Sequence, residues 1–192
     1  MKKEIIERYE RTAAGEIIID ISTQKIEDLY DNFDRLSHFL KKDLNQGLVE
    51  YIIESVREIE GEKFIIQFNL ETDIEHDSIS RVKNSINNFF IYLQDVESRK
   101  IKEMMRTSII FLVLGLVIAT ISVLINQSEL VKTSIATAVI AEGLTVAAWV
   151  SLWESLATFL IKWMPHKKMI LLYRRIANAK VIFNFHKSNY NS

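Results

Sequence analysis

The chain has 192 residues, of which 48% are hydrophobic and 26% are charged, and its formal net charge is −1 at pH 7. This net charge hides a difference between two parts of the chain. Residues 1–106 hold 16 Lys and Arg against 22 Asp and Glu, whereas residues 107–192 hold 8 Lys and Arg against 3 Asp and Glu. The chain has no cysteine, which excludes disulfides and thiolate catalysis, and no phosphate-binding or catalytic motif occurs, so we expect no enzyme, cofactor or metal site.

The first elements predict a small α/β cap over residues 1–76. The segments Glu16–Ile21 (EIIIDI) and Lys63–Leu70 (KFIIQFNL) have strand patterns. Between them, Thr23–Leu40 and Asn45–Glu60 have helical spacing. A third strand candidate, Lys180–Phe185 (KVIFNF), joins the same sheet if both termini lie on one side of the membrane.

A long helix is predicted from Asp77, forming a stalk over residues 77–106. Thr72 and Glu75 have the spacing of a capping box at its start. Apolar residues then follow at alternating spacings of three and four: Ile79, Val82, Ile86, Phe89, Leu93 and Val96. The functional interpretation of such a seam is an oligomeric stalk, and the alternative is a helix that packs on its own sheet.

Two apolar segments predict a transmembrane hairpin. Residues 107–127 (TSIIFLVLGLVIATISVLINQ) contain no charge and, at about 1.5 Å per residue, cross a hydrocarbon core of roughly 30 Å. The second segment covers residues 134–164 and stops before Pro165, so it must tilt or project beyond the lipid. Residues 166–192 then return to the cap as a helix and strand. The predicted fold is an α+β membrane protein.

Basic flanks predict the orientation of this hairpin. Cations precede the first span and follow the second, at Arg99, Lys100, Lys102, Arg106, Lys162, Lys167, Lys168, Arg174, Arg175 and Lys180. The connecting turn has a single lysine, Lys132. The positive-inside rule therefore places both termini in the cytoplasm.

Glu142 and Glu154 lie within the second span. A carboxyl near the bilayer centre costs on the order of 2–3 kcal/mol, so such groups normally face protein or water. Ala147, Ser151, Glu154 and Thr158 share one helix face, and Glu142, Trp149 and Trp153 share another about 120° away.

Two spans cannot enclose a pore, so these faces point to a ring of copies. In such a ring the predicted pore-lining residues are Glu142, Ser151, Glu154 and Thr158. A ring of either carboxylate favours cations, and the pattern leaves open which face points inward. The alternative is a static bundle, in which one glutamate reaches the headgroups and the other is hydrogen-bonded inside.

The second span resembles a group of small bacterial membrane proteins. The similar residues are Ala141–Leu144 (AEGL), Trp149–Val150, Leu152–Glu154 (LWE), Trp163–Pro165 (WMP) and Leu172–Ala177 (LYRRIA), against "EGL…WV.LW.PLE…YDWWP…LYRRLA…V" in the group. In the cap, Asp34–Asp43 (DRLSHFLKKD) with Glu50–Ile52 (EYI) is similar to its "DPSPF..RDLD…EYI" loop. Here the loop prolines are missing, and a serine replaces the proline of "PLE".

Through this group the chain resembles the membrane effectors of the Hailong antiphage system. The resemblance implies a homotetrameric cation channel whose cap binds a short oligodeoxyadenylate made by a partner nucleotidyltransferase, and whose opening depolarises an infected cell. Phosphates need cationic donors, and the candidates are Lys41, Lys42, Arg81, Lys83, Arg99 and Lys100. The alternative function is a membrane-anchored binding or scaffolding protein that conducts nothing.

Overall fold

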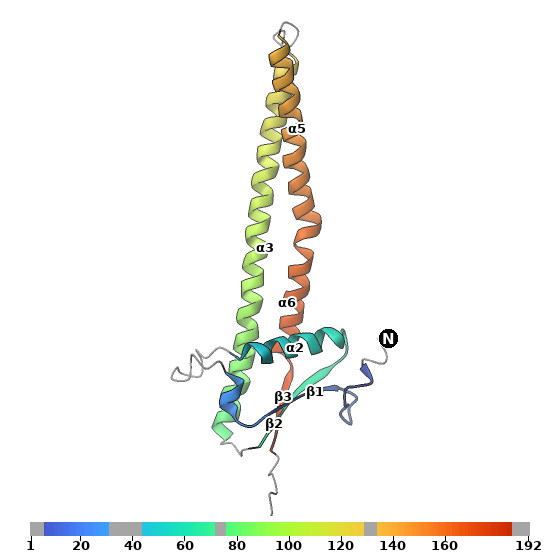
Figure 1. Cartoon of the computed structure of the whole chain (residues 1–192), viewed down its shortest axis with the longest axis vertical. Coiled ribbons are helices and arrows are strands. Elements are labelled where there is room, and N and C mark those ends of the chain that lie inside the picture. The colour runs from blue at the N-terminus through green and yellow to red at the C-terminus, as the bar shows by residue number, and fades with distance from the viewer. Residues whose placement is uncertain (1–5, 31–43, 72–75, 129–133, 186–192) are drawn as a thin grey trace, which may run out of the picture. The chain divides into compact units, whose positions relative to one another are not determined.

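The structure is a computed structural model that describes residues 6–30, 44–71, 76–128 and 134–185. It is mostly helical, with one three-stranded sheet (Figure 1). The chain forms two compact units, one of residues 1–95 with 170–192 and one of residues 96–169. The first unit is called the cap below, and the second is called the hairpin.

The sheet of the cap is parallel, in the order β1 (Ile17–Thr23), β2 (Phe64–Leu70) and β3 (Lys180–Phe185). Ile19 pairs with Ile66, and Ile66 pairs with Val181, so the C-terminal strand β3 lies next to the central strand β2. Helix α2 (Gln46–Glu58) lies between β1 and β2 in the chain, and the Asn45 side chain caps it by accepting a hydrogen bond from Leu48 N.

The prediction of a helix from Thr23 is wrong at its start. Thr23 ends β1, and only a short 3₁₀ helix, η1 (Ile26–Leu29), follows before Tyr30 returns to extended backbone. The Asp28 carboxylate accepts hydrogen bonds from Lys25 N at 3.1 Å and Thr23 Oγ1 at 3.3 Å, and the bond from Lys25 N caps the start of η1, two residues after Thr23. Residues 31–40 of that prediction, and the capping box at Thr72, lie outside the described residues.

The cap core combines one face of the sheet with residues of three helices. Ile19, Ile66 and Phe68 are fully buried in the sheet, and the helices add Ile52, Val56, Val82, Ile86, Phe90 and Ile176. Each such side chain stabilises the fold by about 1.5–3 kcal/mol relative to an exposed one. The early part of the predicted stalk therefore supplies core residues to the cap. This agrees with the interpretation of the apolar seam as a helix that packs on its own sheet.

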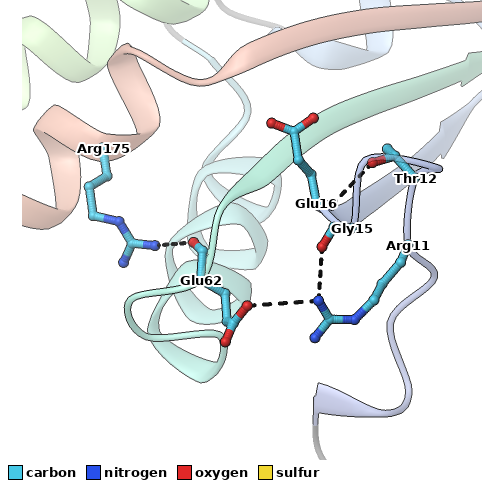
Figure 2. A network of polar contacts seen from close by, with 6 residues as sticks. All are labelled: Arg11, Thr12, Gly15, Glu16, Glu62 and Arg175. Carbon is cyan, nitrogen blue, oxygen red and sulfur yellow. Dashed lines mark hydrogen bonds and ion pairs between the residues drawn. The ribbon is translucent and has the colours of Figure 1, made fainter.

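The loop between α2 and β2 is held by arginines from two other segments (Figure 2). Arg175 donates hydrogen bonds to the carbonyls of Glu60 and Glu62, the latter at 2.8 Å. Arg11 lies 3.7 Å from the Glu62 carboxylate and donates to the Gly15 carbonyl at 2.9 Å. Since Glu60 has a φ of 47°, which non-glycine residues rarely adopt, these contacts stabilise a strained turn.

Two helices are long and apolar enough to cross a membrane. Helix α3 runs without a break from His76 to Asn126, and α5 covers Ile135–Ala157. The predicted second span does not continue as one α-helix, because a π-helical turn, η4 (Thr158–Lys162), follows α5 and α6 (Met164–Ala177) comes next. Apolar side chains on the outside of the hairpin are exposed, among them Val117, Leu124, Val150 and Leu160.

Small residues every two turns form the contact between α3 and α5. Ser108, Gly115 and Ser122 of α3 are buried, as are Ala141, Ala148 and Ser155 of α5. The Ser108 hydroxyl donates to the Ser155 carbonyl at 2.9 Å, and the Ser122 hydroxyl lies 2.6 Å from Thr145 Oγ1. Side chains this small let two helix backbones approach closely, which fixes the antiparallel register of the hairpin.

Candidate functional site

The register of the hairpin sets the level of each glutamate of α5. Glu154 adjoins Ser155, whose partner Ser108 is the second residue of the uncharged run of residues 107–127. Glu142 adjoins Ala141, whose carbonyl accepts a hydrogen bond from Ser122, 14 residues further along that run. Glu154 is therefore level with the first turn of the uncharged run, whereas Glu142 is about 18 Å further along the helix axis, among apolar residues.

The two carboxylates also differ in their partners. Lys162 of the π-helical turn donates a hydrogen bond to Glu154, and the two side chains are each close to half exposed. Glu142 is exposed on the outer surface of α5, and among the described residues it has no hydrogen-bond or ion-pair partner. Within the described part of the chain, Glu142 is thus the carboxylate of α5 that lacks a partner.

The other two predicted pore residues, Ser151 and Thr158, differ in their burial. Ser151 is partly exposed on the side of Glu154, as helical periodicity predicts. Thr158 is only 7% exposed, at the start of the π-helical turn. α-Helical spacing places Thr158 within about 60° of the buried Ser155, in agreement with its low exposure.

A groove of about 510 Å³ runs along the outer surface of the hairpin. We call it the hairpin groove; its lining comprises Ala119, Ser122, Val123, Asn126, Gln127, Thr145, Ala148, Trp149 and Leu152. Asn126 Nδ2 donates to the Ser122 carbonyl at 3.1 Å and otherwise faces the open groove. The groove therefore offers amide and indole donors within an apolar surface.

A polar cluster joins α3 to α6 within the same unit. Glu97 Oε1 accepts from Lys100 at 2.6 Å, and Glu97 Oε2 lies 2.5 Å from His166 Nδ1. Burial acts to raise the pKa of the Glu97 carboxyl, but the hydrogen bonds from Lys100 and His166 outweigh it, so the pKa is lowered. Lys100 is thus engaged by Glu97 and is not a free phosphate donor.

The cations predicted to bind a ligand belong to different parts of the chain. Arg81 and Lys83 are exposed in the cap, whereas Arg99 and Lys100 belong to the hairpin unit. Lys41 and Lys42 lie outside the described residues, so their role stays a prediction.

The cap instead carries polar groups on its open sheet face. Asp20 Oδ1 accepts from Asn69 Nδ2 at 2.6 Å and from Gln67 Nε2 at 3.2 Å, and Tyr51 donates to the Asp20 carbonyl at 3.1 Å. A cavity of about 620 Å³ opens here, with Arg8, Glu10, Glu54 and Glu58 in its lining. Alternating polar residues in the two strands could have indicated this face, and its excess of carboxylates disfavours phosphate ligands.

No known protein family model, curated protein or solved structure matches the chain.

Proposed function

We propose that the chain is one subunit of a homo-oligomeric, ligand-gated cation channel in the bacterial inner membrane, with both termini in the cytoplasm. The observation that carries the proposal is the exposed Glu142, which has no partner among the described residues and lies in an apolar stretch of α5. A carboxyl so placed is unfavourable in lipid by on the order of 2–3 kcal/mol, and a neighbouring copy relieves that cost by supplying polar partners. The same neighbours supply the walls that one hairpin lacks.

The conducting path is assigned to the side of α5 that carries Ser151 and Glu154. Gly143 and Ala147 lie on that side as well, and their small side chains leave room for a hydrated ion. Glu142 is about 120° away around the helix, so it does not share one path with Glu154. Glu154 then stands at the cytoplasmic mouth, where a ring of carboxylates attracts cations and Lys162 partly neutralises it.

Gating is proposed to follow a nucleotide signal bound by the cap, as the resemblance to antiphage effectors implies. A short oligodeoxyadenylate is the ligand to try first, and channel opening would depolarise an infected cell. The acidic cavity beside Asp20 is a poor site for such a polyanion. Lys41, Lys42, Arg81 and Lys83 remain the cationic candidates.

Ion flux into liposomes that contain the purified full chain tests the proposal. We expect cation flux on adding the oligodeoxyadenylate or under voltage. Glu154→Gln should lower the preference for cations over anions, and Lys162→Gln should raise it because it frees the carboxylate. Glu103→Gln, an exposed acid elsewhere in the unit, is the control. Absence of conductance in every state would reject the channel.

A second function, a non-conducting membrane anchor for a binding or scaffolding cap, is favoured by the pairing of Glu154 with Lys162. In that case one glutamate is neutralised at the interface, and no assembly of copies is needed. Mass photometry in mild detergent separates the two functions, because a monomer cannot form a pore.

A further inference from the structure

We propose that Glu142 of one copy accepts a hydrogen bond from Asn126 in the hairpin groove of a second copy. The contact rests on the assembly of copies proposed above. It assigns Glu142 to an interface between hairpins, whereas the sequence pattern had made it a pore-lining candidate.

The first step is that donors and an acceptor lie unsatisfied on the same apolar hairpin. Glu142 lacks a partner, and so do the side chains of Gln127 and Trp149 among the residues that the structure describes. Asn126 adds an amide whose described bonds go only to Ser122. Polar groups without partners are costly in hydrocarbon, where no water substitutes for them.

The second step is that these groups lie at the same depth. Ser122 bonds to the carbonyl of Ala141, the residue before Glu142, and Asn126 is one turn beyond Ser122. Along the helix axes Glu142 and Asn126 are therefore about 6 Å apart, which two side chains can span. Copies that insert with the same topology keep this depth, so the Glu142 of one meets the groove of another at the correct level.

The third step is that the carboxylate and the groove flank the same part of α5. Glu142 is about 100° around the helix from the packing residue Ala141, and Trp149, which lines the groove, lies within about 20° of Glu142. A surface with an acceptor beside a donor-lined groove can bind copies of itself. In a ring of copies about the membrane normal, each copy gives its Glu142 to one neighbour and receives the glutamate of the other neighbour.

Disulfide cross-linking in native membranes tests the contact, because the natural chain has no cysteine to interfere. Full-length copies carrying Glu142→Cys and Asn126→Cys, with different affinity tags, are coexpressed and oxidised. The matched control replaces Asn126→Cys with Leu124→Cys, which lies on the same helix but about 200° away and is 63% exposed. We expect the Glu142–Asn126 heterodimer to exceed the control at least fivefold.

Two results would overturn the contact: a heterodimer no more abundant than the control, or a dominant cross-link of Glu142→Cys with itself, which would put the carboxylates around a common axis. If the first variants do not accumulate, a second cysteine pair, Val139→Cys with Val123→Cys, tests the same interface by cross-linking and leaves Glu142 and Asn126 unchanged. Cross-linking does not depend on conduction, so a negative result with normal flux rejects this contact alone, and absent flux with a strong cross-link rejects the channel alone.

Discussion

Replacing Gly115 with alanine tests how closely α3 and α5 approach each other. A Cβ at this position would lie 2.9 Å from both Cγ and Cδ2 of Leu152, and 3.2 Å from its backbone nitrogen. Non-bonded carbons are normally 3.5–4.0 Å apart, so either Leu152 or the whole of α5 must shift by several tenths of an ångström. Since the backbone of α5 is part of the obstacle, rotation of the Leu152 side chain does not remove it.

We expect Gly115→Ala to destabilise the hairpin by about 1–3 kcal/mol, the usual cost of overpacking a fitted contact. The matched control is Gly143→Ala on α5, where an added Cβ meets no atom within 4 Å. Both changes carry the same gain in helix propensity, at most about 1 kcal/mol, so their difference isolates the packing term.

The free energy of hairpin unfolding is measured by titration with SDS in mixed micelles, with helicity followed by circular dichroism. A second readout is the rate of disulfide formation between cysteines introduced at Ser108 and Ser155, which should fall in Gly115→Ala because the helices separate. Equal midpoints for the two alanine variants would refute the close approach and, with it, the register on which the depths of Glu142 and Glu154 depend.

Two further predictions concern the polar contacts. Arg175→Ala should destabilise the cap by about 1–2 kcal/mol, because it removes charge-assisted hydrogen bonds to two carbonyls. It should also speed amide hydrogen exchange in residues 59–64. The control Arg174→Ala removes a side chain with no described partner and should change neither quantity. The Glu97 carboxyl has a pKa below its ordinary 4.5. Its ionised form therefore contributes fully to the stability of the fold above pH 4.5, and this contribution is lost as pH falls through the lowered pKa. The free energy of unfolding of the hairpin unit should therefore decline below about pH 4.5. The decline should be smaller in Glu97→Gln than in the control Glu103→Gln. Equal declines in the two variants would exclude this stabilising role of Glu97.

The sequence alone determined the elements whose pattern is local. An uncharged run of 21 residues predicted a long apolar helix. Alternating segments rich in β-branched residues predicted strands close to those observed, and Lys180–Phe185 is the clearest case. The helix predicted from Thr23 was wrong at its start, because Thr23 pairs with Leu70 in the sheet and the helical turn begins only after Lys25.

Tertiary structure decided what the glutamates of α5 can do. Spacing in the sequence showed that Glu142 and Glu154 lie on different faces, but it set no depth for either. Depth follows from the pairing of Ser108 with Ser155 and of Ser122 with Thr145, contacts between residues far apart in the chain. Likewise, Asp20 meets Asn69 because two strands pair in register. Local patterns encode which residues form an element, whereas the partners of each polar group depend on how those elements pack.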